Sequence, residues 1–66
     1  MNAQEGTMAN KTTTKALQTA GFFLDDLREM IKDQGSDPLA VDVLYDMIKE
    51  TVEIRRKLEL FADRER

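Results

Sequence analysis

The chain has 66 residues, with 13 Asp and Glu against 10 Lys and Arg, a formal net charge of −3, and neither His nor Cys. A chain of this length forms one small domain and buries only about 60% of the surface that its unfolded form exposes. Disulfides and the common structural metal sites are excluded as sources of stability, so we expect self-association to supply it.

Residues 1–12 are small and polar and lack hydrophobic periodicity, which predicts a flexible N-terminal tail. They contain no apolar segment of the kind that a signal peptide needs, and no later apolar run is long enough to span a membrane. We therefore expect a cytoplasmic protein. The hydroxyl side chains of Thr12, Thr13 and Thr14 offer an N-cap for a first helix.

The first helix is predicted over about residues 13–34, because its apolar residues alternate between three- and four-residue spacings along one helix face. This seam consists of Leu17, Ala20, Leu24, Leu27 and Ile31. A second row, with a seven-residue repeat, widens the apolar face on one side and consists of Ala16, Phe23 and Met30. Charged residues fill most of the remaining positions, so the outer face should be solvated.

A tight turn is predicted between residues 34 and 38. Gly35 can adopt the left-handed conformation that closes a helix C-terminus, Asp37 can cap a second helix, and Pro38 fits the first turn of that helix. So short a connection makes the two helices antiparallel neighbours.

The second helix is predicted over about residues 38–64, and no Gly or Pro interrupts it after Pro38. Its expected seam consists of Ala40, Leu44, Met47, Thr51, Ile54, Leu58 and Phe61. A flanking row consists of Val41, Ile48, Arg55 and Ala62. The fold class is therefore all-α, an antiparallel helical hairpin.

One hairpin cannot cover all of this apolar surface. Residues 39–48 are apolar around most of the helix, which is typical of a helix buried on more than one side. Leu58 and Phe61 are expected to lie near or beyond the start of the first helix, where they have no partner within the hairpin. Both features favour a homodimer in which two hairpins form a four-helix bundle. The predicted dimer interface consists of Val41, Leu44, Tyr45, Ile48, Val52, Leu58 and Phe61.

The second helix has an acidic first half and a more basic second half. Acidic residues near the N-terminus and basic residues near the C-terminus suit the helix dipole, and this alone can explain the pattern. Alternatively, two copies of the helix lie antiparallel, with the acidic half of one beside the basic half of the other.

Phe22 faces away from the seam of the first helix and is the main candidate for binding another protein. An isolated exposed aromatic side chain without a role is the simpler interpretation. We predict a partner-binding surface of Phe22, Asp26 and Glu29, with Leu60 as a second contact near the C-terminus. Gly21, beside Phe22, either allows another helix to approach closely or is a tolerated surface glycine.

We expect no catalytic residues, no cofactor and no metal site, because the chain lacks His, Cys and any phosphate-binding or metal-ligand motif. The run Arg55-Arg56-Lys57 is spread around the helix, so nucleic acid is not the expected partner. The preferred hypothesis is a homodimeric module that binds another protein as an inhibitor, adaptor or assembly regulator, of the kind that phages and mobile elements often encode.

Two alternatives remain open. In architecture, a short hairpin that dimerises into a four-helix bundle resembles the Rop family of plasmid copy-number regulators. That resemblance implies RNA binding through the first helix by basic and aromatic side chains, and Phe22 is the aromatic residue at the matching surface. The other alternative is a purely structural subunit that serves oligomerisation.

Overall fold

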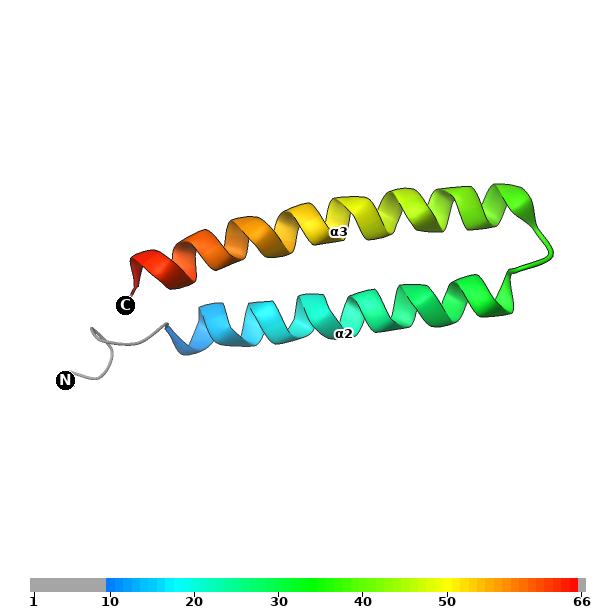
Figure 1. Cartoon of the computed structure of the whole chain (residues 1–66). Helices are drawn as coiled ribbons and strands as arrows, with labels where there is room; N and C mark the ends of the chain where they lie inside the picture. Colours follow the sequence, from blue (N-terminus) through cyan, green and yellow to red (C-terminus); the bar gives the residue numbers. More distant parts are fainter. Residues whose placement is uncertain (1–9, 66) are drawn as a thin grey trace.

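The computed structural model describes residues 10–65, which form two antiparallel helices packed side by side (Figure 1). Helix α2 comprises Lys11–Asp33 and helix α3 comprises Pro38–Arg64. No strand occurs within these residues. The predicted all-helical hairpin is confirmed, whereas the four-helix bundle stays a prediction. Most of the predicted N-terminal tail lies outside the described residues, but Lys11 and Thr12 belong to α2.

A side-chain cap at the start of α3 stabilises the turn. Asp37 is the N-cap, and its Oδ1 accepts hydrogen bonds from the backbone N–H groups of Leu39 (3.2 Å) and Ala40 (3.3 Å). Pro38 follows as the first helical residue, where its missing N–H costs no hydrogen bond. The prediction of how α3 begins is therefore confirmed.

The end of α2 differs from the prediction, because no residue of the described chain has a positive φ angle, Gly35 included. Gln34 is the C-cap, with φ −101°, and its backbone N–H donates to the carbonyl of Met30 at 2.8 Å. The N–H of Asp37 then donates to the carbonyl of Gln34 at 2.8 Å. With these two hydrogen bonds the chain reverses direction although none of the turn residues has a positive φ angle. A left-handed glycine is therefore not needed.

The start of α2 lies against the end of α3. Asn10, not one of the three threonines, is the N-cap of α2, and its side chain accepts from the backbone N–H of Thr12 at 2.7 Å. The carboxylate of Glu65 accepts from the backbone N–H of Asn10 (2.8 Å) and from the hydroxyl of Thr13 (3.0 Å). The predicted extension of α3 beyond α2 is therefore wrong, because α2 begins early enough to reach the last turn of α3.

The core is a single narrow seam between the helices. The α2 seam is as predicted: Leu27 is completely buried, Ala20 and Leu24 are buried, and Leu17 and Ile31 are half-buried. On α3 the buried residues are Leu44, Thr51 and Ala62. The buried hydroxyl of Thr51 donates to the carbonyl of Met47 at 2.7 Å, so its burial leaves no hydrogen bond unmade.

The seam of α3 is rotated relative to the prediction. Ile54 and Phe61, expected in the seam, are 56% and 55% exposed, whereas Ala62, expected on the flank, is buried. The physical reason is that Leu44, Thr51 and Leu58 form a central row with an apolar row on each side of it. One neighbouring helix covers the central row and only part of either flank.

The seam predicts a clear difference between Leu27 and a nearby exposed residue. Leu27→Ala removes methyl groups from a closed site and should lower the free energy of unfolding by about 2–5 kcal/mol. Met30→Ala, whose native side chain is 44% exposed, should lower it by much less. Urea unfolding followed by circular dichroism measures both variants, and equal losses would show that the seam is not the core.

Candidate functional site

The hairpin leaves more large apolar side chains exposed than it buries. Its buried apolar residues are Ala20, Leu24, Leu27, Leu44 and Ala62. Ten large apolar side chains are exposed: Phe22, Phe23, Met30, Leu39, Val43, Tyr45, Val52, Ile54, Leu60 and Phe61. Exposed apolar surface on this scale is typical of proteins that contact another molecule.

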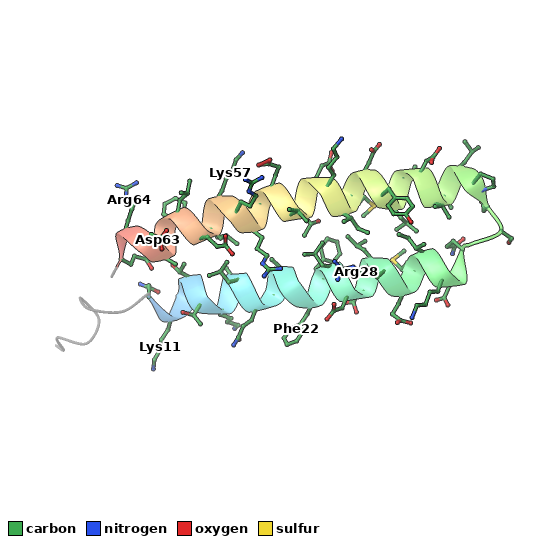
Figure 2. The ribbon with its side chains drawn as sticks, in the orientation of Figure 1. Lys11, Phe22, Arg28, Lys57, Asp63 and Arg64 are labelled. Atoms are coloured by element: carbon green, nitrogen blue, oxygen red, sulfur yellow. The ribbon has the colours of Figure 1, made fainter. Side chains whose placement is uncertain are left out.

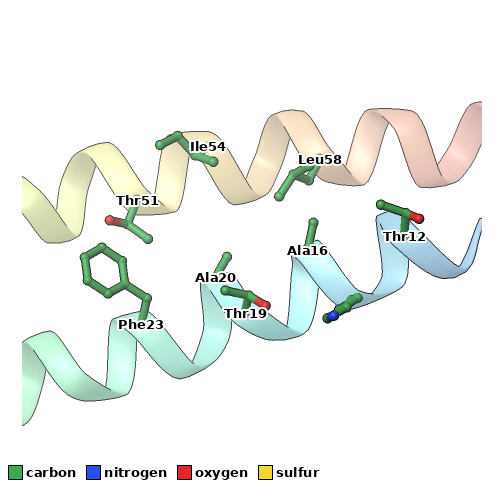
Figure 3. Close-up of a pocket in the computed structure, with 9 residues that line it drawn as sticks. Thr12, Ala16, Thr19, Ala20, Phe23, Thr51, Ile54 and Leu58 are labelled. Atoms are coloured by element: carbon green, nitrogen blue, oxygen red, sulfur yellow. The ribbon is translucent and has the colours of Figure 1, made fainter.

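One broad side of the hairpin carries an open groove of about 420 Å³, which we call the apolar groove (Figure 3). The residues that line it are Thr12, Lys15, Ala16, Thr19, Ala20, Phe23, Thr51, Ile54 and Leu58. Across it, Ala16 faces Leu58, Ala20 lies near Ile54, and Phe23 faces Thr51. Almost all of its exposed lining is apolar, with Lys15 as its one charged residue.

The sequence of α2 explains the hollow. The side chains of α2 that line the groove include the short ones of Ala16, Thr19 and Ala20, which leave the space beside α3 unfilled. Phe23 is much larger and bounds the groove on the side nearer the turn. On α3, Ile54 lies between the seam residues Thr51 and Leu58 in the sequence and lines the same groove. The groove thus combines a floor of small residues with large apolar residues beside it.

A second hollow of about 310 Å³, which we call the Phe22 notch, lies on the other side of the seam. Its lining residues are Gln18, Gly21, Phe22, Leu24, Asp25, Arg28 and Arg55. Gly21 and Arg28 each follow a buried seam residue of α2, whereas Phe23 precedes one. Residues before and after a seam position point to opposite sides of the hairpin, so the notch and the apolar groove lie on opposite sides.

The two guanidinium groups of the notch are held by carboxylates. Arg28 Nη1 lies 3.5 Å from Asp25 Oδ1, and Arg55 Nε lies 4.0 Å from Glu59 Oε2. All four side chains are largely exposed, so each ion pair contributes little stability.

The structure places the predicted partner-binding residues on two separate edges. Phe22 is 68% exposed and points away from α3 (Figure 2). Asp26 and Glu29 are exposed on the same helix, and Glu29 pairs with Lys32 at 3.4 Å. Leu60 is 62% exposed on α3, midway between the inward positions of Leu58 and Ala62 and so on the far side of that helix. Phe22 and Leu60 therefore do not form one surface.

The predicted dimer-interface residues are distributed over three parts of the hairpin. Four of them lie in or beside the seam and are buried or half-buried within one chain: Val41, Leu44, Ile48 and Leu58. Tyr45 and Val52 follow buried seam residues and share the side of the Phe22 notch. Phe61 shares the side of the apolar groove. Their role in dimerisation stays a prediction.

Sequence reasoning did not assign Phe23 or Ile54 to a candidate site, although both line the groove. A signal was present, because Ala16, Phe23 and Met30 form a row beside the seam that one facing helix cannot cover.

No protein family, curated protein or solved structure matches this chain. Within residues 10–65, neither helix is long and apolar enough to cross a membrane. The same residues contain no group of three acidic side chains positioned to hold a metal ion.

Substitution of Gly21 tests whether the notch is open to solvent. A Cβ atom at this position would have no neighbour within 4 Å, and Gly inside a helix is about 0.5–1 kcal/mol less favourable than Ala. We expect Gly21→Ala to raise the free energy of unfolding by about that amount. Thermal unfolding measures the change, and a loss of stability would mean that another helix approaches Gly21 closely.

Proposed function

We propose that this chain is a homodimeric helical module that acts by binding another protein, as an inhibitor, adaptor or assembly regulator. The observation that carries the proposal is the excess of exposed over buried large apolar side chains. Such surface is unfavourable in water and is normally covered in a functional assembly. Two broad sides and two outer edges are available, so one hairpin can contact its own copy and a different partner at the same time.

The charged side chains support binding in place of catalysis. Four ion pairs, such as that between Glu53 and Arg56 at 3.9 Å, each join exposed residues three or four positions apart along one helix. Such pairs favour helix formation and solubility. Neither hollow encloses a charged group away from water, which acid-base chemistry would use to alter reactivity.

We place the contact with the other protein at the outer edge of α2 around Phe22. Phe22 is the most exposed aromatic side chain of the described chain, and Asp26 and Glu29 lie one and two turns further along the same edge. An aromatic residue beside acidic residues suits a partner with an apolar pocket bordered by basic side chains. Leu60, on the opposite edge, is available for a separate contact.

RNA binding is the second candidate, and the notch supplies the observation that favours it. Arg28 and Arg55 line the same hollow as Phe22, and a surface that combines an aromatic ring with guanidinium groups can bind an unpaired base. Both guanidinium groups are already paired with carboxylates, so we rank this candidate below protein binding.

Affinity capture from the native host, with and without nuclease, tests the proposal. We expect the full-length chain to retain a specific protein after nuclease treatment. Phe22→Glu should abolish that retention, because a charge replaces the apolar contact at the centre of the predicted surface. Thr14→Glu is the matched control, since it adds the same charge at an exposed position of α2 outside both hollows.

The oligomeric state of Phe22→Glu must be measured in the same experiment by size-exclusion chromatography. An unchanged elution volume with lost capture would place Phe22 at the partner contact. A change of oligomeric state would place Phe22 in the interface between copies. Loss of every captured protein on nuclease treatment would favour RNA binding.

A further inference from the structure

We propose that the apolar groove is covered by a second copy of this chain, turned end for end so that the turn of each copy lies beside the chain ends of the other. This inference rests on the homodimer of the proposed function and adds its surface and orientation. The groove side exposes Phe23, Met30, Ile54 and Phe61, and it is the side with the least charge in its hollow.

The charges of the hairpin select the orientation. The half that contains the turn, residues 23–50, has eight acidic and three basic side chains. The other half, residues 10–22 and 51–65, has six basic and four acidic side chains. Packing turn beside turn would bring two acidic halves together, which opposes association. End-for-end packing puts each acidic half beside the more basic half of the other copy.

In the proposed dimer, the two-fold axis runs across the groove from Ala20 on α2 to Ile54 on α3. This axis places large residues of one copy against small residues of the other. Phe23 lies three residues after Ala20, and Ala16 lies four residues before it, on the same side of α2. The axis therefore sets Phe23 of one copy against Ala16 of the other. Small floor residues facing a large side chain give the interlocking that helix packing requires.

The same axis gives consistent pairs along α3. Met47 and Phe61 each lie seven residues from Ile54, so they face one another across the copies, while Ile54 meets its own equivalent at the axis. These pairs are the ones that an antiparallel helix contact produces, because residues equidistant from the axis meet. The rows that a single hairpin leaves exposed thus cover each other.

The charged borders agree with this register. Glu50 lies four residues before Ile54 and Lys57 three residues after it, on the outer border of the groove side. Each copy therefore presents Glu50 to Lys57 of the other.

The contact is large enough for a specific dimer. An overlap of about 20 residues is about 30 Å long, and two adjacent helices are about 20 Å wide. This area, about 600 Å² on each copy and about 1,200 Å² in total, reaches the lower end of the range for stable protein interfaces.

Disulfide cross-linking of the full chain tests the axis, because the native sequence has no Cys. Ile54→Cys should form a covalent dimer under mild oxidation, since the two thiols meet at the axis and need Cα atoms within about 7 Å. Leu60→Cys is the matched control, because Leu60 is about as exposed as Ile54 but lies on the outer edge of α3. The double variant Thr19→Cys with Ile54→Cys tests the turn-beside-turn arrangement, in which α2 of one copy would lie over α3 of the other.

Charge reversal gives an independent readout. Glu50→Lys should weaken the dimer by about tenfold, because two border pairs become repulsive in the symmetric assembly. Adding Lys57→Glu should restore the affinity, since each reversed residue again meets an opposite charge. Within one helix the two residues are about 10 Å apart, so the rescue can arise only between copies.

The outcomes separate this inference from the proposed function. Cross-linking through Ile54 together with the charge rescue would support the end-for-end dimer. A stable dimer that links only through Leu60, or only in the Thr19 and Ile54 double variant, would overturn the inference and leave the homodimer of the proposed function in place. A monomer at every concentration would overturn both and leave the groove to a different molecule.

Discussion

Two helices that lie side by side can bury only the stripe that each presents to the other, and this geometric limit determines the character of the molecule. Leu27 is closed off completely between α2 and α3, yet Phe23, four residues earlier, is already 43% exposed. The apolar face of each helix is wider than the stripe that its neighbour covers. The hairpin therefore has a closed core between its helices but leaves apolar surface uncovered on its outside. That uncovered surface is the basis for proposing a second copy and a partner.

The two ends of the hairpin are fixed by polar interactions that add little apolar burial. Asp37 caps α3 at the turn, and Glu65 accepts hydrogen bonds from Asn10 and Thr13 at the opposite end. These contacts set the lengths of the helices and bring the start of α2 to the last turn of α3. With both ends aligned, the uncovered apolar surface lies along the sides of the hairpin, where another helix pair can pack against it.

The sequence predicted most features that depend on spacing and local chemistry, although not how α2 ends at Gly35, and it failed on those that depend on which neighbour a side chain meets. The α2 seam, the Asp37 cap and the outward position of Phe22 follow from spacing and propensity. The seam of α3 could not be assigned, because apolar rows flank Leu44 and Thr51 on both sides and either could face α2. Asn10 was missed because three threonines nearby can also cap a helix, and Glu65 favours the earlier start only once the hairpin is closed.

The central claim is that the hairpin is half of an assembly, and molar mass in solution tests it most directly. Sedimentation equilibrium of the full-length chain, from micromolar concentrations upward, measures it without labels or substitutions. The account predicts twice the chain mass of 7.6 kDa, with dissociation toward that mass on dilution. A constant mass of 7.6 kDa at every concentration, with the helices still formed, would contradict it.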